Sequence, residues 1–146
     1  METHYRDMRK RLGVLVDEMG EPEGGQWNLD PENRKTHGDW KKEGRPVPVA
    51  SAAFEHDDVT TRATQDVEKW FPKAPGQARR LWLPVTRAQA LKALKNFVEF
   101  RLGRFGDFED MMVSAEPHLF HSLLSAPINL GLLSPMECVE AAVAAY

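Results

Sequence analysis

Within residues 105–135, two serines and a histidine interrupt an otherwise apolar helical pattern, which lies between an aromatic and acidic segment and a well-marked helix start. Ser122 and Ser125 are three positions apart and would share one face of a helix. The leucines of the segment would largely share another face: Leu119, Leu123 and Leu130. The pattern therefore predicts a helix from residue 119 to about residue 131, with an apolar back and room for a small polar site in front.

Capping signals predict further helices on either side of this segment. Thr86 is followed three residues later by Gln89, which makes a capping box and opens a helix to about residue 102. Residues 134–137, Ser-Pro-Met-Glu, place an N-cap, a first-turn proline and a glutamate in register, so a last helix begins there. This helix runs to Tyr146 without a stop signal, which suggests that further material follows.

The first half of the chain has a different character. Residues 1–29 predict a short charged helix over 2–12, followed by a small β-hairpin with a Gly/Pro turn. Residues 30–58 contain three prolines, few aliphatic residues and mixed charge, and predict an extended linker. Asp58 is then the expected N-cap of a helix over 59–70.

These elements define the expected fold class. It is mainly α, a helical array with a small N-terminal β-hairpin and an extended linker, and the helical part occupies residues 59–146. A length of 146 residues fits one domain, or one small domain with an appendage. The hydrophobic fraction of 42% is ordinary for a soluble globular protein and gives that domain enough apolar residues for a core.

Charge and cysteine content restrict the possible partners. The net charge of −3 gives no overall attraction to DNA, although a local basic patch remains possible. Such a patch would use residues interspersed with acids, which favours a solvated surface: Arg6, Arg9, Lys10, Arg11, Arg79 and Arg80. The single cysteine, Cys138, suits a reducing compartment. No apolar run is long enough to cross a membrane, and we expect a cytoplasmic protein.

Other chemistries for the polar residues are less well supported. The serines could simply bond back to helix carbonyls inside a core helix. His121 and Ser122 could suggest a hydrolase, but adjacent helical residues point apart and the chain has no Gly-x-Ser-x-Gly turn. The five histidines have no metal-ligand spacing on one helical face. His118 and His121 are three apart and could be neighbours, but Pro117 places them at the helix entry. The acidic cluster of residues 107–110 would favour a helix dipole at a first turn. We therefore assign no catalytic residue and no metal ligand.

Four stretches of the chain resemble a known family. They read HYRDMRKRLGVLVD, GGQWNLDPENRK, LWLPVTRAQALKALKNFVEFRLGRFGDFEDMM and LFHSLLSAPINLGLLSPMECVEAA. Their combined order resembles the photolyase and cryptochrome flavoproteins, and within them the bacterial iron–sulfur branch of photolyase-related proteins. The resemblance extends over nearly the whole chain.

The resemblance implies a place for this chain in the family's architecture. Family members join an N-terminal antenna domain through a long connector to an all-α FAD domain, and this chain resembles the connector plus the first FAD-domain helices. The segment HSLLS corresponds to the part that wraps the FAD phosphates and ribityl chain, which implies flavin contacts by His121, Ser122, Leu123, Leu124 and Ser125. Phe108 lies near the position at which family members have a flavin-contacting tyrosine. Because phenylalanine lacks the hydroxyl group, the resemblance implies only a packing role for Phe108.

The chain also departs from the family pattern. The branch holds its iron–sulfur cluster with four cysteines, whereas this chain has only Cys138, which matches none of them, so we expect no cluster here. The proline after the second serine is shifted by one position, to Pro127. Because most of a ligand's surface has to be enclosed for binding, we expect FAD in the parent protein and none held by this chain alone.

Two hypotheses from different classes follow. The first is a fragment of a photolyase-like or cryptochrome-like FAD protein, acting in the parent on pyrimidine photoproducts in DNA or in blue-light sensing, and inactive alone. The second is a non-enzymatic helical module that pairs with itself or with a partner and binds no cofactor, because a helical domain cut from a larger one exposes an apolar face. A yellow protein would favour the first, and a colourless concentration-dependent dimer the second.

Overall fold

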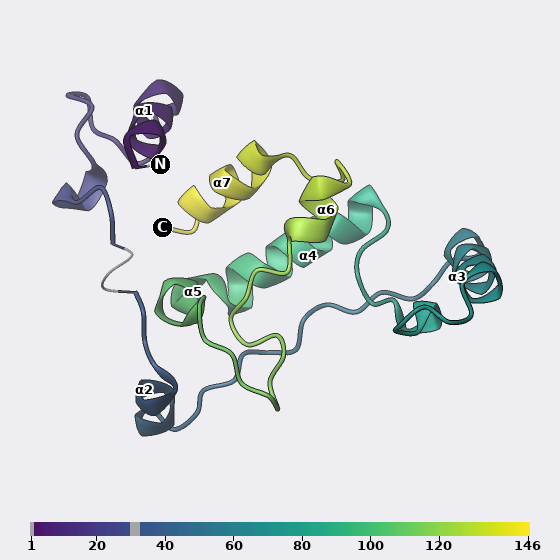
Figure 1. Cartoon of the computed structure of the whole chain (residues 1–146). Helices are drawn as coiled ribbons and strands as arrows, with labels where there is room; N and C mark the ends of the chain where they lie inside the picture. The colour runs from purple at the N-terminus through teal and green to yellow at the C-terminus, as the bar shows by residue number, and fades with distance from the viewer. Residues whose placement is uncertain (1, 30–32) are drawn as a thin grey trace.

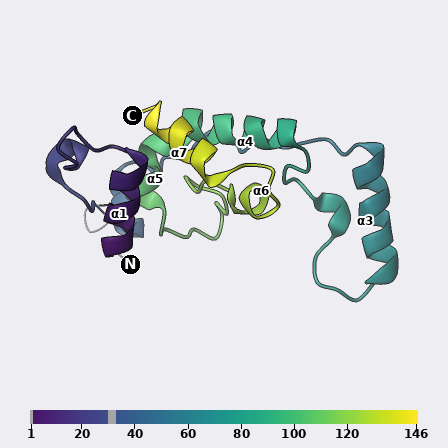
Figure 2. The ribbon, with the colours of Figure 1, turned by 90° about the horizontal axis from the view of Figure 1, so that it is seen from above.

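The structure is a computed structural model that describes residues 2–29 and 33–146, and within them it is mainly helical (Figure 1). Four helices form the central body: α4 (Arg87–Phe100), α5 (Leu102–Phe108), α6 (Ser125–Asn129) and α7 (Pro135–Val143). Helix α1 (Glu2–Leu12) and helix α3 (Asp58–Trp70) lie at opposite ends of the molecule (Figures 1 and 2). The prediction of a mainly α fold is confirmed.

The predicted N-terminal hairpin is wrong. After α1, which has the expected bounds, Val16 and Pro22 form only an isolated bridge, and the described residues contain no regular strand. The Asp17 carboxylate instead accepts hydrogen bonds from the backbone N–H groups of Met19 (2.9 Å) and Glu21 (2.8 Å), which closes a tight loop. Pro22 has no N–H to extend a ladder, so the pairing stops after one bridge.

The N-terminal segment folds around one arginine and one indole. The Arg9 guanidinium donates to the carbonyls of Val14 (3.1 Å) and Leu15 and lies 5.1 Å from the centre of the Trp27 ring. Lys10 Nζ lies 5.1 Å from the same ring, in cation–π contact. These contacts hold the loop against the last turn of α1 in the absence of a sheet.

Part of the predicted extended linker is helical. Helix α2 (His37–Lys42) begins with a capping box between Thr36 and Asp39, and its Trp40 is only 5% exposed. Residues 46–57 have no helix or strand. The predicted start of the linker at Asp30 lies outside the described residues, together with residues 31 and 32. The connecting segment is therefore anchored in the body of the protein through an aromatic side chain.

The capping boxes predicted for α4 and α7 are both formed. In α4, Gln89 Oε1 accepts from the backbone N–H of Thr86 (3.2 Å). In α7, the Glu137 carboxylate accepts from the backbone N–H of Ser134, and Ser134 Oγ accepts from the backbone N–H of Glu137. The N-cap of α3 is Asp57, one residue earlier than predicted. The acidic residues Asp107, Glu109 and Asp110 lie in and just after the last turn of α5 rather than opening a helix, so the dipole interpretation of that cluster is wrong.

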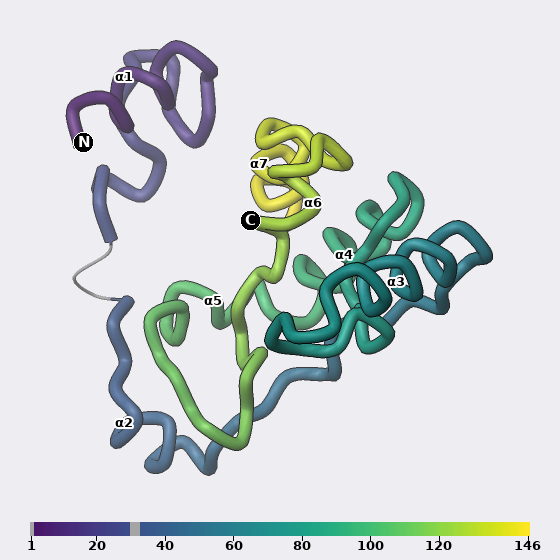
Figure 3. The backbone as a smooth tube through the Cα atoms, turned by 45° about the vertical axis from the view of Figure 1, so that its right-hand side comes forward, coloured from purple at the N-terminus to yellow at the C-terminus, as the bar shows by residue number. Residues whose placement is uncertain are grey.

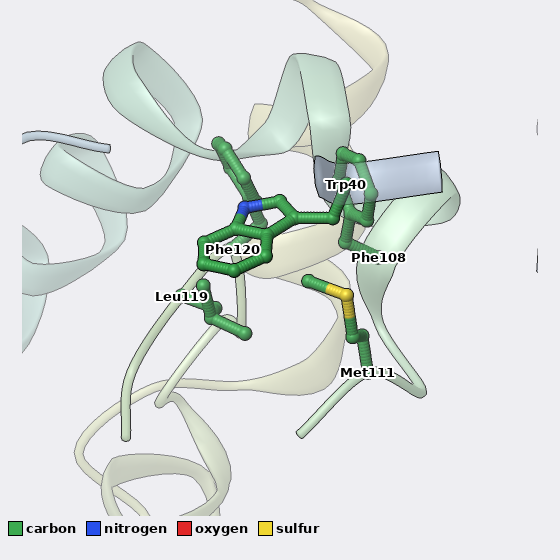
Figure 4. Close-up of a cluster of buried hydrophobic side chains, with 5 residues drawn as sticks. All are labelled: Trp40, Phe108, Met111, Leu119 and Phe120. Atoms are coloured by element: carbon green, nitrogen blue, oxygen red, sulfur yellow. The ribbon is translucent and has the colours of Figure 1, made fainter. Parts of the chain in front are cut away.

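Two apolar clusters hold the body together. The first lies between α4, α6 and α7 and consists of Ala90, Leu94, Phe97, Leu124 and Leu133. The second joins α2 to α5 and the following loop and consists of Trp40, Phe108, Met111, Leu119 and Phe120 (Figure 4). The linker and the loop between α5 and α6 run past each other (Figure 3), where Ser51 Oγ lies 3.1 Å from His118 Nδ1.

Four charged side chains cover the second cluster on its α5 side. Lys35 Nζ lies 2.8 Å from Asp107 Oδ2 and 3.0 Å from Glu43 Oε1. Arg104 pairs with the same two acids, at 3.3 Å from Asp107 Oδ2, and its guanidinium lies 4.8 Å from the Phe108 ring centre. Arg104 and Lys35 lower the pKa of Glu43, while Asp107 and Glu43 raise the pKa of Lys35.

The start of α7 carries a pH-dependent contact. Arg87 and the backbone N–H of Ser134 bind the Glu137 carboxylate and lower its pKa to about 2 from an ordinary 4.5. A carboxyl group with a lowered folded-state pKa stabilises the fold above its unfolded pKa and loses that contribution as the pH falls. We expect the wild-type chain to be more stable than Glu137→Gln at pH 6, and the difference to vanish between about pH 4.5 and pH 2.

Urea unfolding followed by circular dichroism at several pH values measures this difference. Glu140→Gln, on the exposed face of the same helix, is the matched control and should show no comparable pH-dependent loss. A constant gap between wild type and Glu137→Gln down to pH 2 would contradict the prediction.

Candidate functional site

The segment HSLLS does not lie in the long helix predicted for residues 119–131. Residues 121–124 have no regular secondary structure, and the helix that follows, α6, starts only at Ser125. Pro127 explains the late start, because its ring would clash with the carbonyl four residues earlier, at Leu123, in a continuous helix. Ser122 and Ser125 therefore do not share a helical face, and that prediction is wrong.

The side chains of the segment divide between the core and the surface. Leu124 is buried in the cluster beneath α4. His121 Nε2 lies 3.2 Å from the Met111 carbonyl oxygen, so the imidazole ties the segment to the second cluster and is not paired with Ser122. Ser122 is half-buried and Ser125 is exposed. The two hydroxyl groups are thus the side-chain donors that remain within reach of solvent.

The backbone of the segment changes direction at residues 123 and 124. Leu123 has a left-handed φ of 60°, and Leu124 follows with φ −96° and ψ −4°. A left-handed residue followed by a right-handed one turns successive N–H groups toward one side, as in anion-binding backbone nests. Among the described residues, no hydrogen bond engages the N–H groups of residues 122–125. These four amides and the hydroxyls of Ser122 and Ser125 are neutral donors of the kind that bind phosphate groups.

Phe108 lies elsewhere, at the centre of the second cluster. Its ring is 0% exposed, is stacked on Phe120 with ring centres 5.4 Å apart, and is covered by Arg104. The structure links it to HSLLS only indirectly, since His121 bonds to the backbone of Met111 in the same cluster.

The sequence interpretation missed a buried arginine. Arg101 is 3% exposed; its Nη2 donates to Asn96, while Nε and Nη1 have no partner among the described residues. Burial lowers the pKa of its guanidinium. The signal was present, because Arg101 continues the apolar stripe of α4 at helical spacing from Leu94 and Phe97.

Two findings about the described residues concern metal ions and membranes. In residues 2–29 and 33–146, no group of three or more His, Cys, Asp or Glu side chains is placed to hold a metal ion. In the same ranges, no helix is long and apolar enough to cross a membrane. Cys138 is half-buried against the first cluster, and burial raises the pKa of its thiol.

The described residues thus form a helical body with a connecting segment packed against it through Trp40. The chain belongs to the deoxyribodipyrimidine photo-lyase-related protein family, whose model matches residues 1–82. A (6-4) photolyase from Agrobacterium fabrum is 39% identical to it over the full chain. The chain spans 28% of the length of that relative. The family predicted from the sequence motifs is thereby confirmed.

Proposed function

We propose that this chain forms the connector and the first FAD-domain helices of a photolyase-like flavoprotein, and that residues 121–125 bind the FAD phosphates. The observation that carries the proposal is the run of unengaged donors at HSLLS, where Leu123 and Leu124 turn the backbone N–H groups toward one side. The similarity to a (6-4) photolyase and to the photolyase-related family supports the choice of a flavin over other phosphate ligands.

The residues of the segment have separate roles in this proposal. His121 fixes the position of the loop through the Met111 carbonyl, and Leu124 anchors it in the core. The hydroxyl groups of Ser122 and Ser125 and the neighbouring amides then donate to phosphate oxygens. Phe108 contributes only indirectly, by packing in the cluster to which His121 is bonded through Met111. Reduced FAD, when bound, would supply the electron for repair of DNA pyrimidine photoproducts, or the light response of a blue-light sensor.

The chain supplies only one wall of such a pocket, so binding to it alone should be weak. An iron–sulfur cluster does not fit this chain, because four thiolates are required and Cys138 is its one cysteine. The proposed DNA partner rests on the family. The proposed cytoplasmic location rests on the cysteine usage.

Amide chemical shifts provide a test that needs no activity. In a ¹⁵N spectrum, millimolar FAD or inorganic pyrophosphate should shift the N–H signals of residues 122–125 more than those elsewhere. Ser122→Ala/Ser125→Ala should weaken this binding by roughly tenfold, taking about 0.7 kcal/mol for each exposed hydroxyl–phosphate bond. Ser114→Ala, an exposed serine of the preceding loop, is the matched control. Shifts that are scattered over the chain, or unchanged in the double variant, would reject the phosphate site.

The alternative, a helical module that pairs with itself, has one observation in its favour. A groove of about 640 Å³ runs beside α4 and α7 and is lined mainly by apolar side chains, among them Val98, Leu102, Val139 and Val143. A colourless chain whose sedimentation depends on concentration would favour this alternative over flavin binding.

A further inference from the structure

Helix α3 and the short helix η3 (Ala78–Arg80) form an arm that projects away from the helical body (Figures 1 and 2). We define the arm tip as residues 69–80, with the sequence KWFPKAPGQARR. The tip contains four cationic residues and no aspartate or glutamate: Lys69, Lys73, Arg79 and Arg80. A strongly basic loop therefore stands out on a chain whose net charge is −3.

Two aromatic side chains are exposed among these cations. Trp70 is 71% exposed and Phe71 is 64% exposed. Lys69 Nζ lies 5.8 Å from the centre of the Trp70 ring. Large aromatic residues left together in water are typical of interaction sites, since their exposure forfeits the free energy of burial. Arg79 pairs with Glu68 at 3.6 Å, but both are at the surface, where such pairs are weak and a phosphate can replace the carboxylate.

We propose that the arm tip binds DNA, with its cations on backbone phosphates and bases of an unpaired stretch stacked on Trp70 and Phe71. Cations combined with exposed aromatic rings are the features by which proteins hold single-stranded nucleic acid. An acidic peptide would use the cations but not the two flat rings. The choice of DNA over other polyanions rests on the proposed function, and the tip adds to it a contact surface outside the flavin segment.

The other basic segment of the chain is not equivalent. Arg9 is committed to backbone carbonyls of its own loop. The Trp27 ring that Arg6, Arg9 and Lys10 contact is half-buried, unlike Trp70 and Phe71 of the arm tip. The α1 cations also lie at the opposite end of the molecule from the arm tip (Figure 2), so the two groups do not form one patch. Of the two basic segments, the arm tip is therefore the candidate for DNA binding.

Fluorescence anisotropy of a dye-labelled oligothymidine measures the binding, with the full chain at about 20 mM salt. The logarithm of the affinity should fall with the logarithm of the salt concentration, with a slope of about −0.7 for each phosphate contact. Arg79→Ala/Arg80→Ala should weaken binding at least tenfold and reduce the slope by about 1.4. Trp70→Ala should weaken it about tenfold by removing base stacking.

A matched control and a spectroscopic readout separate stacking from charge alone. Lys92→Ala/Lys95→Ala removes two exposed cations from α4 and should change the affinity less than twofold. Binding should quench the tryptophan fluorescence of wild type, and the quenching should disappear in Trp70→Ala. All replaced side chains are exposed, and circular dichroism checks that each variant is folded.

Several outcomes would overturn the inference: no binding at 20 mM salt, equal losses in the α4 control, or vesicles of phosphatidylserine binding as tightly as DNA and with the same dependence on Trp70. The amide shifts of residues 122–125 with FAD are measured on the same variants. If the wild-type chain gives FAD shifts but binds no DNA, or if the arm-tip variants bind DNA as tightly as wild type, only the arm tip is rejected. If DNA binding depends on the arm tip as expected but the FAD shifts are absent, only the flavin site is rejected.

Discussion

Replacement of Phe108 by alanine should lower the free energy of unfolding by about 3–5 kcal/mol. The ring is fully buried and stacked on Phe120, and Arg104 lies over its face. Alanine would remove the apolar surface, leave a cavity among Trp40, Met111 and Leu119, and take the aromatic partner from the guanidinium. Urea unfolding followed by near-UV circular dichroism measures the loss.

Phe71→Ala is the matched control for this experiment. It removes the same side chain from a site where the ring is already exposed, and it should change stability by no more than about 0.5 kcal/mol. A loss of less than 1 kcal/mol in Phe108→Ala would contradict the packing of the second cluster. Phe108→Leu retains most of the apolar volume and should recover a large part of the stability.

Replacement of Trp40 by alanine should also cost about 3–5 kcal/mol, although the residue lies in a segment with the composition of a linker. Its ring packs against α5 and the loop after it, and its indole Nε1 donates to the Pro46 carbonyl at 2.9 Å. Without the indole, the segment loses its main apolar anchor. Trypsin should then cleave after Lys41 or Lys42 much faster than in the wild-type chain.

Two variants separate the contributions of Trp40. Trp40→Phe keeps an aromatic ring and loses the hydrogen bond, so it should cost about 1 kcal/mol from that bond plus a packing loss. His37→Ala removes an exposed ring stacked on Trp40 at 5.5 Å and should cost less than about 1 kcal/mol. Unchanged stability and unchanged cleavage in Trp40→Ala would mean that the linker is not anchored.

The predictions that succeeded depend on local chemistry. A capping box needs only residues three apart, so Thr86 with Gln89 and Ser134 with Glu137 could be identified from the sequence alone. The predicted end of α1 at residue 12 is also local in origin, because Gly13 adopts a left-handed φ of 66° after the last turn.

The predictions that failed depend on proline and on distant contacts. The hairpin prediction ignored the missing N–H of Pro22, and the helix over residues 119–131 ignored the clash that Pro127 imposes on the preceding turn. Helix α2 has six residues, too few for a periodic signal, and Trp40 is buried by partners about 70 residues away in the chain. Such burial cannot be predicted from a local window.

The candidate site also combines features that the sequence predicts with features that only the structure reveals. The sequence and the family resemblance located the HSLLS segment, but a left-handed Leu123 and the unengaged amides became visible only in the structure. The spacing of the serines suggested a shared face, whereas the donors that the site offers are mostly backbone groups, which no side-chain pattern can indicate.

The charge cluster over Phe108 determines how the contact between the connecting segment and α5 responds to mutation. Lys35 and Arg104 each contact both Glu43 and Asp107, so neutralising any one member leaves every remaining charge with an oppositely charged neighbour. Each base has two acidic partners and each acid has two basic partners, so the contact does not depend on any single ion pair. Replacement of one of these charges should therefore cost little, and the ionic contact between the connecting segment and α5 is lost only when both members of one sign are replaced.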